Sequence, residues 1–417
     1  MLISIGIGYG FGIWIGKARK KGRGKAGLLI GSGILLSFLF YYKYIDFAIT
    51  SVNRLTGLAI APLKVVLPIG ISFYTFQIVS YFIDVYRGSA KAQKNILDFA
   101  AYVMLFPQLI AGPIVRYVDI DEQLSNRKCT VESVYLGLRR FVMGLSKKVL
   151  LADQLGAFLE VFLRMEDKTV LFYWLYAVSF TLQIYFDFSG YSDMAIGLGK
   201  VFGFDFLENF NYPYVSLSIT EFWRRWHMSL GFWFRDYVYI PLGGNRVGPF
   251  RWFCNLLIVW ALTGLWHGAS WNFVWWGLLF GVVLILEKKW LLHFLEKMPK
   301  GIRHFYVMTI VVFSFVLFQA TDMAQVQELF RGMFGRLDVP WNSGETRYYM
   351  QSYAVVFGLG IVGCTPFPKR AVEMVQDKER FGKIAAVVEP AALSLLFLLV
   401  LARLVDGSFQ PFLYFRF

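Results

Sequence analysis

Long apolar stretches recur from one end of this 417-residue chain to the other, beginning with MLISIGIGYGFGIWIG at residue 1. Only 17% of the residues are charged and 57% are hydrophobic, whereas soluble proteins carry about 25% charged residues. Because about 20 consecutive apolar residues span a bilayer as one helix, the pattern predicts an all-α, polytopic membrane protein.

The individual stretches predict a series of membrane-crossing helices. They lie near residues 2–16, 27–44, 64–86, 97–112, 170–187, 254–266, 270–286, 305–320, 352–365 and 387–404. The first stretch lacks a basic start and a small-residue cleavage site, so we interpret it as a retained span and not as a signal peptide. No internal repeat or linker is visible, and we therefore expect a single domain over residues 1–417.

Basic residues outnumber acidic ones, with 42 Lys and Arg against 28 Asp and Glu and a net charge of +14. They gather between the apolar segments, which is typical of cytoplasmic loops under the positive-inside bias. We therefore expect the lipid bilayer as a partner and no nucleic acid. The basic clusters lie at residues 17–25, 138–140, 147–148, 287–289 and 369–383.

Two parts of the chain fit neither a plain span nor a loop. Residues 133–163 have apolar residues at helical spacing but charges throughout, which is typical of a helix at the interface or inside a bundle. Residues 206–246 are too polar to span and too apolar for an ordinary loop. Irregular backbone at membrane depth needs cover from protein or a water-filled cavity, so we expect a re-entrant or interfacial element there. Within it SITE (218–221) predicts a helix start, and PLGGN (241–245) predicts a turn.

One histidine lies in the apolar, aromatic stretch LTGLWHGASW, within the expected helix pair at residues 254–286. An ionisable group inside a span is costly and is by default a functional candidate. Burial favours the neutral imidazole, which is the form that accepts a proton. The alternative for His267 is a packed histidine that only bonds to a neighbouring helix, and the local residues leave both interpretations open.

The other histidines have different surroundings. His227 follows two arginines in RRWHMSL, where an interface anchor beside headgroups and a functional role both fit the residues. His293 and His304 lie at expected helix ends beside basic residues, where such side chains snorkel to the interface, and we assign them no role. Four histidines and three widely separated cysteines indicate neither a metal site nor a disulfide framework.

Polar side chains also follow the span at 170–187. Residues 189–205 are short and glycine-rich, which predicts a separate helix packed against protein. Asp187 and Asp193 then fall at the end of one helix and inside the next, where a carboxylate either orients a histidine or caps the following helix. Asn209 and Asn211 can donate and accept beside a turn at Pro213. The chain has no glycine-rich phosphate loop, GxSxG or HExxH motif.

Taken together, these motifs carry a resemblance. The segment from FDFSGYSD through SITEFWRRWHMSLGFWFRDYVYIPLGGNR, followed by LTGLWHGASWNFVWWG, resembles the membrane-bound O-acyltransferase family. Within the family it is most similar to the bacterial alginate O-acetyltransferase branch, and it is related to the teichoic acid D-alanyltransferases. LPIGISFYTFQIVSYFIDVYRG (67–88), FPQLIAGPIVRY (106–117) and PFLYFRF (411–417) extend the resemblance over most of the chain.

The resemblance implies about ten to twelve transmembrane or re-entrant helices around a central funnel. It also implies that His267 is catalytic and that His227 is a second functional histidine toward the cytoplasmic side. Relatives usually carry a further hydrophobic stretch before the segment that matches residues 1–16, so the sequence leaves the helix number and topology open. The D-alanyltransferases lack YIPLGGNR after FRDY, and its presence favours the acetyl branch.

We therefore expect an O-acetyltransferase of the bacterial cytoplasmic membrane that uses a cytoplasmic thioester, acetyl-CoA, as a substrate and holds no bound cofactor. The acceptor is the hydroxyl of an extracytoplasmic polysaccharide or of a secreted SGNH-type partner, with a buried histidine as general base. Alternatives are D-alanyl transfer from an acyl carrier protein and a non-catalytic transporter or scaffold. The expected site residues are catalytic His267 and His227, supporting Asp187, Asp193, Asn209, Asn211 and Trp266, and donor-binding Arg224, Arg225, Trp223 and Trp226, with no metal ligands.

Overall fold

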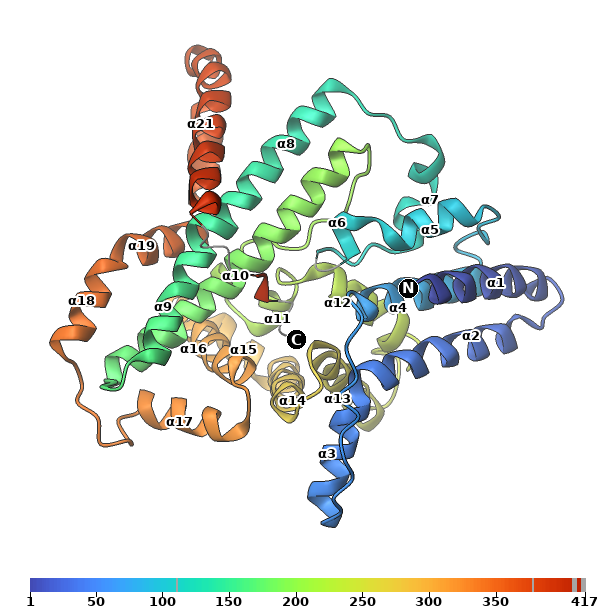
Figure 1. Cartoon of the computed structure of the whole chain (residues 1–417), viewed down its shortest axis with the longest axis horizontal. Coiled ribbons are helices and arrows are strands. Elements are labelled where there is room, and N and C mark those ends of the chain that lie inside the picture. The colour runs from blue at the N-terminus through green and yellow to red at the C-terminus, as the bar shows by residue number, and fades with distance from the viewer. Residues whose placement is uncertain (110–111, 377–378, 407–410, 414–417) are drawn as a thin grey trace.

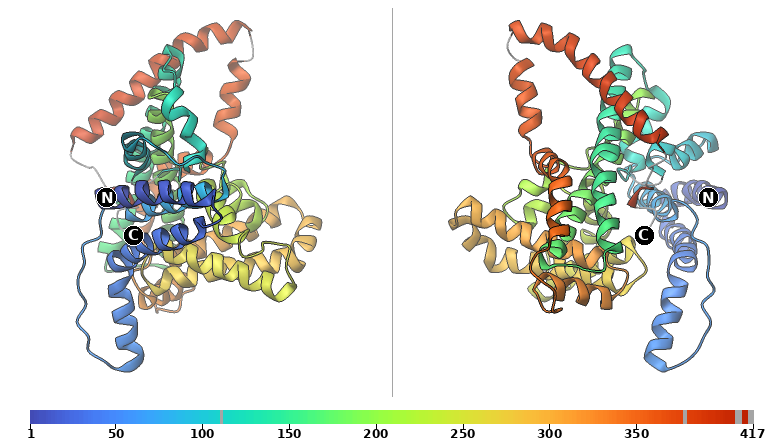
Figure 2. Two further views of the ribbon diagram at one scale, coloured as in Figure 1. Left: turned by 90° about the vertical axis from the view of Figure 1, so that its right-hand side faces the viewer. Right: turned by 60° about the vertical axis from the view of Figure 1, so that its left-hand side comes forward.

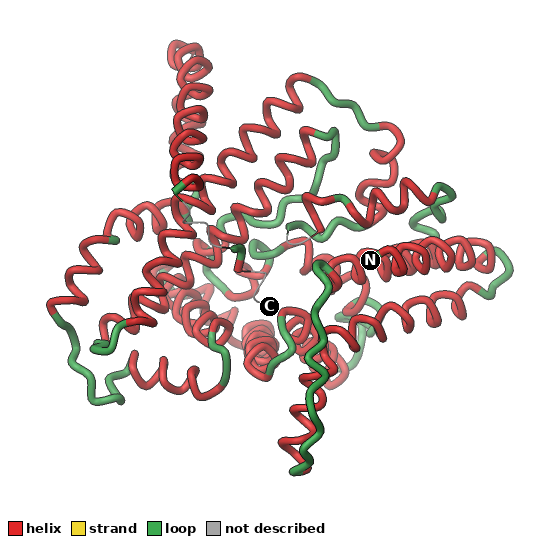
Figure 3. Tube along the Cα trace, viewed as in Figure 1, coloured by secondary structure: helices red, strands yellow, loops and turns green. Residues whose placement is uncertain are grey.

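The computed structural model describes residues 1–109, 112–376, 379–406 and 411–413. These residues form helices and loops with no strand among them, which confirms the all-α fold class (Figures 1 and 3). Residues 377–378 of the basic cluster at 369–383 and residues 414–417 of the PFLYFRF motif lie outside the described residues.

The N-terminal helices differ from the expected spans at two places. The span expected at 64–86 begins only at Ile71, after an irregular segment that contains Pro62 and Pro68. The span expected at 97–112 divides at Leu105, because Pro107 cannot donate the hydrogen bond that would continue the helix. The elements are α1 (Leu2–Arg19), α2 (Gly24–Leu39), a π-helical turn (Phe40–Tyr44), α3 (Ile45–Thr56), α4 (Ile71–Arg87), α5 (Ile96–Met104), α6 (Phe106–Leu109) and α7 (Tyr117–Asn126).

In the middle of the chain, two helices expected to be separate form the single helix α10 (Val170–Val201). The expected break at Ser189 and Gly190 does not occur, because the glycines there serve helix packing. A Cβ atom added at Gly144 would lie 2.5 Å from the carbonyl oxygen of Gly190, so only glycine permits this crossing. The partner is the helical run α8 (Val131–Ser146), a π-helical segment (Lys147–Ala152) and α9 (Asp153–Arg164).

Residues 206–246 form short helices and turns and contain no helix of spanning length. Ser218 caps α11 as expected, because its hydroxyl accepts a hydrogen bond from the backbone N–H of Glu221 at 3.0 Å. The turn predicted at PLGGN is also present. The elements are a 3₁₀ turn (Pro213–Val215), α11 (Ile219–Trp223), α12 (Met228–Phe234) and a π-helical turn (Arg235–Tyr239).

The expected pair at 254–286 is a tight hairpin of α13 (Pro249–His267) and α14 (Trp271–Leu286). Any Cβ atom at Gly264 would collide with the backbone oxygen of Phe273, and one at Gly277 with that of Trp260. The two backbones therefore touch along the hairpin, and His267 is the last residue of α13 before the turn.

The C-terminal part adds further helices. The span expected at 352–365 is broken at Tyr353, which leaves an apolar helix of 10 residues after it. The elements are a π-helical turn (Glu287–Leu291), α15 (Leu292–Lys297), α16 (Lys300–Gln319), α17 (Met323–Met333), α18 (Gly344–Ser352), α19 (Ala354–Gly363), α20 (Phe367–Gln376) and α21 (Glu379–Val405). Of these, α16 packs against α14 and α10, and α21 packs against α8. Both α21 and α3 extend away from the body of the molecule (Figure 2).

Within the described residues, 3 helical stretches are long and apolar enough to cross a membrane, namely Gly24–Thr56, Lys300–Gln319 and Val387–Val405. These apolar stretches identify the chain as a membrane protein. Of the ten spans expected from the sequence, several are shorter helices or parts of longer ones.

The described residues form two apolar cores. One is built mainly from α9, α10, α14 and α16, and the other from α1, α2, α4 and α5. Residues 206–246 belong to both, since Phe222 and Trp226 pack in the first core and Trp233 and Phe234 in the second. We call the boundary between the two cores the seam.

Candidate active site

His267 lies at the seam, where α13 ends. Its side chain is buried among aromatic rings of both cores, with ring centroids 5.0 Å from Trp266, 5.1 Å from Trp276 and 5.3 Å from Phe318. Trp266 belongs to the second core and Trp276 and Phe318 to the first. The turn of the hairpin therefore places the imidazole between the two halves of the fold.

His227 lies opposite, between α11 and α12. Its backbone has φ +44° and ψ +53°, a left-handed conformation that few residues other than glycine adopt and that costs roughly 1–3 kcal/mol. This conformation turns the chain and directs the side chain inward, where only 2% of the residue is exposed. The ring centroids of His227 and His267 are 6.4 Å apart. Residues 40 positions apart in the sequence thus form one buried pair.

Asn209 fixes the tautomer of His227. Its side-chain oxygen accepts hydrogen bonds from the hydroxyl of Ser229 at 2.9 Å and from the backbone N–H of Ser229 at 3.3 Å, and its amide donates to Ser192 at 3.0 Å. The oxygen lies 3.1 Å from Nδ1 of His227, which must then donate. The neutral ring consequently presents the lone pair of Nε2, which has no hydrogen-bond partner among the described residues.

The same network reaches Ile114 in the FPQLIAGPIVRY motif, whose residues 110–111 lie outside the described residues. The backbone N–H of Ile114 donates to the hydroxyl of Ser229 at 2.9 Å, and that hydroxyl donates to Asn209. The backbone of Asn209 also accepts from Met228 N–H at 3.0 Å. Three separate motifs of the sequence are therefore joined by hydrogen bonds around His227.

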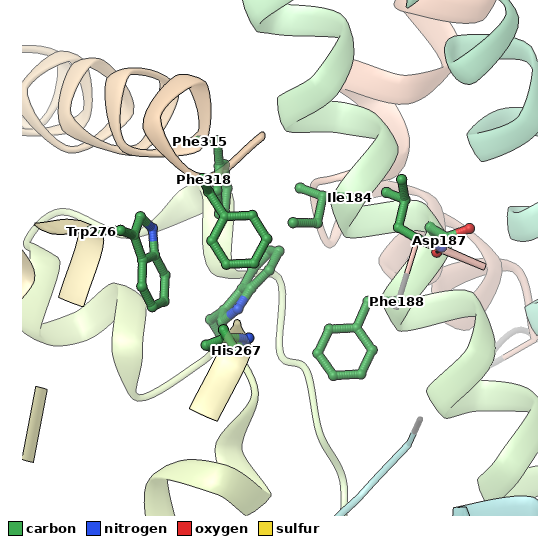
Figure 4. A pocket seen from close by; sticks show the side chains of 9 residues that line it. Ile184, Asp187, Phe188, His267, Trp276, Phe315 and Phe318 are labelled. Atoms are coloured by element: carbon green, nitrogen blue, oxygen red, sulfur yellow. The ribbon is translucent and has the colours of Figure 1, made fainter. Parts of the chain in front are cut away.

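A small cavity opens on one side of His267 (Figure 4). It measures about 20 Å³, which is room for about one water molecule. The walls are almost entirely apolar, so the cavity excludes bulk water around the imidazole. Its lining residues are Ile184, Asp187, Phe188, Trp226, His267, Trp276, Phe315, Phe318 and Leu413.

Asp187 reaches this cavity from α10 as part of a buried ionic triad. Nζ of Lys148 lies 2.6 Å from Asp187 and 2.7 Å from Asp153, and Asp187 also accepts from the backbone N–H of Leu413 at 3.0 Å. Of the two roles left open for Asp187, capping of a following helix is wrong, because α10 continues past it. Its carboxylate instead links α10 to the preceding helical run and to the C-terminal segment.

Asp193 also lies inside α10 and caps no helix. It pairs with Arg140 at 2.9 Å and with Lys147 at 2.6 Å, and Arg140 also binds Glu208 at 2.5 Å. It is not among the residues that line the cavity. The basic clusters at 138–140 and 147–148 are expected in cytoplasmic loops, but they lie within helices, and their basic side chains form ion pairs with carboxylates of the protein.

The expected donor-binding residues divide into two groups. Trp223 and Trp226 are core aromatics: Trp223 contacts Trp260 at a centroid distance of 4.6 Å, and Trp226 lines the cavity. Arg225 is bound to Glu221 at 2.9 Å and to the backbone oxygen of Asn211 at 3.2 Å. The side chain of Arg224 is exposed and forms no ion pair among the described residues. This arrangement leaves Arg224 as the guanidinium that is open to an anion.

Three charged residues near the site were not singled out in the sequence. Lys148 and Glu287 were assigned to basic loop clusters, yet both are buried, and Glu287 accepts hydrogen bonds at 2.7 Å from the backbone N–H groups of Ile219 and Thr220 at the start of α11. Lys43 lies in an apolar helical stretch and contacts α13. These residues could have been found in the sequence as charges inside an apolar helical pattern, because such a charge is a functional candidate by default.

Comparison with known proteins gives concordant matches. The profile of the membrane-bound O-acyltransferase family matches residues 87–325. The probable alginate O-acetylase of Pseudomonas putida is 40% identical over 409 residues, which cover 94% of this chain and 84% of the relative. The peptidoglycan O-acetyltransferase of Helicobacter pylori is 35% identical over 340 residues, or 74% of this chain and 64% of the relative. The teichoic acid D-alanyltransferase of Bacillus subtilis is 29% identical over 228 residues, or 52% of this chain and 58% of the relative.

Proposed function

The chain belongs to the membrane-bound O-acyltransferase family, and we propose that this membrane O-acyltransferase moves acetyl groups from cytoplasmic acetyl-CoA to a hydroxyl on the opposite side of the membrane. The relatives that cover most of the chain are named for O-acetyl transfer to alginate, and a further one for transfer to peptidoglycan. The acceptor we propose is accordingly a polysaccharide hydroxyl, reached directly or through a secreted SGNH-type partner. The setting we propose is a multi-pass fold in a bacterial cytoplasmic membrane.

The observation that carries the proposal is the buried histidine pair at the seam. In the proposed reaction His267 takes the proton from the acceptor hydroxyl while the hydroxyl oxygen attacks the carbonyl carbon of the thioester. The C–O bond forms, the C–S bond breaks, and the proton passes to the leaving sulfur, so that the products are an acetyl ester and free CoA. Positioned general-base catalysis of this kind contributes about 10²–10⁴-fold.

The position of His227 supports a part in the same proton transfer. The residues around His227 leave an interface anchor and a functional role open, but its ring is buried and lies 6.4 Å from that of His267 between centroids, whereas Arg224 is exposed. With Nδ1 held by Asn209, its Nε2 is a neutral acceptor oriented by a third group. We therefore assign His227 to the proton-transfer pair and Arg224 to the donor phosphates.

D-alanyl transfer from an acyl carrier protein is the second candidate, because a teichoic acid D-alanyltransferase also matches this chain. It would use the same histidine pair with a different thioester, and the thioester that supplies the acyl group distinguishes the two candidates in an assay. A transporter or scaffold would not need the pair, and both histidines with their network are intact here.

The test uses membrane vesicles that contain the full chain and labelled acetyl-CoA, with alginate or peptidoglycan fragments as acceptor. We expect label in the acceptor with the wild-type chain, and a loss of at least about 10²-fold for His267→Gln. His293→Gln, at an exposed helix end, is the matched control and should transfer normally. Near-normal transfer by His267→Gln would contradict the base assignment, and labelling that requires a D-alanyl carrier protein would favour the second candidate.

A further inference from the structure

Lys43 lies next to the catalytic hairpin although 224 positions separate it from His267 in the sequence. It belongs to the helical stretch Gly24–Thr56, which is long and apolar enough to cross a membrane. Its Nζ donates to the backbone oxygen of Trp266 at 2.5 Å and lies 3.4 Å from the hydroxyl of Ser72 on α4. The ammonium group therefore points into the protein, and not along the helix toward the headgroups.

The neighbouring Tyr44 makes a parallel contact. Its hydroxyl donates to the backbone oxygen of Leu265 at 2.8 Å. The last carbonyls of a helix have no partner within the helix, and they carry the negative end of the helix dipole. Lys43 and Tyr44 thus satisfy two consecutive carbonyls at the end of α13, immediately before His267.

The local structure of this segment is adapted to that contact. Residues Phe40–Tyr44 form a π-helical turn between α2 and α3, and such turns often mark functional positions. Among the side chains that the structure describes, no carboxylate lies within ion-pair distance of Lys43. The nearby Asp46 is bound to the backbone N–H groups of Leu63 at 2.6 Å and Val65 at 3.3 Å. A lysine in an apolar span without a counter-carboxylate is costly, and the carbonyl of Trp266 is its main partner.

We propose that Lys43 is a positioning residue of the acyl-transfer site, which fixes the end of α13 and the imidazole of His267 through a charge-assisted bond to the carbonyl of Trp266. The proposal rests on the function proposed above, because it assigns Lys43 to the catalytic hairpin. It also explains why a helical stretch outside the matched family region, residues 87–325, contacts the site.

The first test compares steady-state transfer by Lys43→Met, Lys43→Arg and the control Lys25→Met in vesicles. Lys25 lies in the same helical stretch with an exposed side chain. We expect kcat of Lys43→Met to fall about tenfold or more, the equivalent of one charge-assisted hydrogen bond. The KM for acetyl-CoA should stay unchanged, and Lys43→Arg should recover much of the lost kcat. Wild-type kcat in Lys43→Met would overturn the proposal.

The second test does not depend on acetyl transfer. Diethyl pyrocarbonate modifies imidazole nitrogens, and the chain has 4 histidines that peptide mass analysis can follow separately. We expect His267 to react several-fold faster in Lys43→Met than in the wild type or in Lys25→Met, because its helix end is released. An unchanged rate would overturn the proposal even if acetyl-CoA is not the donor, and an inactive wild type with a changed rate would contradict only the proposed function.

If Lys43→Met does not accumulate in membranes, Tyr44→Phe takes its place in both tests. This variant removes only the hydroxyl that binds the carbonyl of Leu265 and keeps the ring. We expect a smaller loss of kcat in the same direction and a smaller rise in the reactivity of His267. No change in either quantity would overturn the proposal.

Discussion

Asn209→Ala gives the sharpest prediction about the histidine pair, because it removes the group that fixes the ring of His227. The side-chain oxygen of Asn209 serves Nδ1 of His227 at 3.1 Å and two donors of Ser229 at 2.9 and 3.3 Å. Without it, His227 can exchange its tautomer and rotate, and Nε2 is no longer held as a proton acceptor.

The structure sets the expected changes in kcat and in the free energy of unfolding of Asn209→Ala. Loss of one orienting hydrogen bond of roughly 1 kcal/mol lowers the population of the active ring about fivefold. The fall in kcat should not exceed the whole contribution of a proton-transfer group, which is about 10²–10⁴-fold. Buried donors left without a partner cost about 1–3 kcal/mol each, and since the hydroxyl of Ser229 can rotate, we expect a loss of unfolding free energy of about 2 kcal/mol.

The assay is steady-state acetyl transfer in vesicles, together with thermal unfolding in detergent. Asn211→Ala is the matched control: Asn211 is expected from the sequence among the supporting residues, but its side chain is exposed two residues away, and its backbone bonds to Arg225 survive the change. We expect kcat to fall in Asn209→Ala and not in Asn211→Ala, with the same KM for acetyl-CoA in both.

A double-mutant cycle decides whether Asn209 acts through His227. In a His227→Gln background, Asn209→Ala should lower kcat no further, since the ring that it orients is absent. Additive losses would show that Asn209 acts elsewhere. Wild-type kcat in Asn209→Ala, or an equal loss in Asn211→Ala, would refute the orientation argument altogether.

Two further predictions concern packing and donor binding. Gly144→Ala should lower the unfolding free energy by about 1–3 kcal/mol, because the new Cβ would lie 2.5 Å from the oxygen of Gly190. Gly33→Ala, which has open space around it, should not; equal melting temperatures for the two variants would contradict the close crossing. Arg224→Ala should raise the KM for acetyl-CoA several-fold at unchanged kcat, since its guanidinium is exposed and unpaired with acids among the described residues. Arg225→Ala should instead lower thermal stability, because Arg225 is bound to Glu221; the reverse pattern would exchange the two assignments.

Much of the fold follows from local patterns that the sequence displays. The hairpin at 254–286 and the capped start of α11 depend on apolar runs and on Ser218, which act over a few residues. The continuity of α10 was missed for a physical reason: Ser189 and Gly190 indicate a break if only local preference is considered. The glycines face α8, and packing across the crossing outweighs their poor helix propensity.

The candidate site was predictable residue by residue but not as an arrangement. The motifs singled out His267, His227 and Asn209, whereas the tautomer of His227 depends on which atoms of Asn209 and Ser229 meet. Lys148 was misassigned because two adjacent lysines are typical of a cytoplasmic loop. Only the three-dimensional structure shows its ammonium between two buried carboxylates.

The seam between the two cores is the part of the molecule best suited to admit substrate. The α8–α10 crossing and the α13–α14 hairpin are held by direct backbone contact at glycines, so neither pair can separate without losing dense packing. The cavity beside His267 has room for about one water, which is less than an acetyl group and its thioester need. The residues that line it contribute large apolar side chains, and these can change rotamer at much lower cost than a helix pair can separate. Binding of the donor should therefore displace the aromatic rings at the seam and leave the two glycine-packed pairs in place.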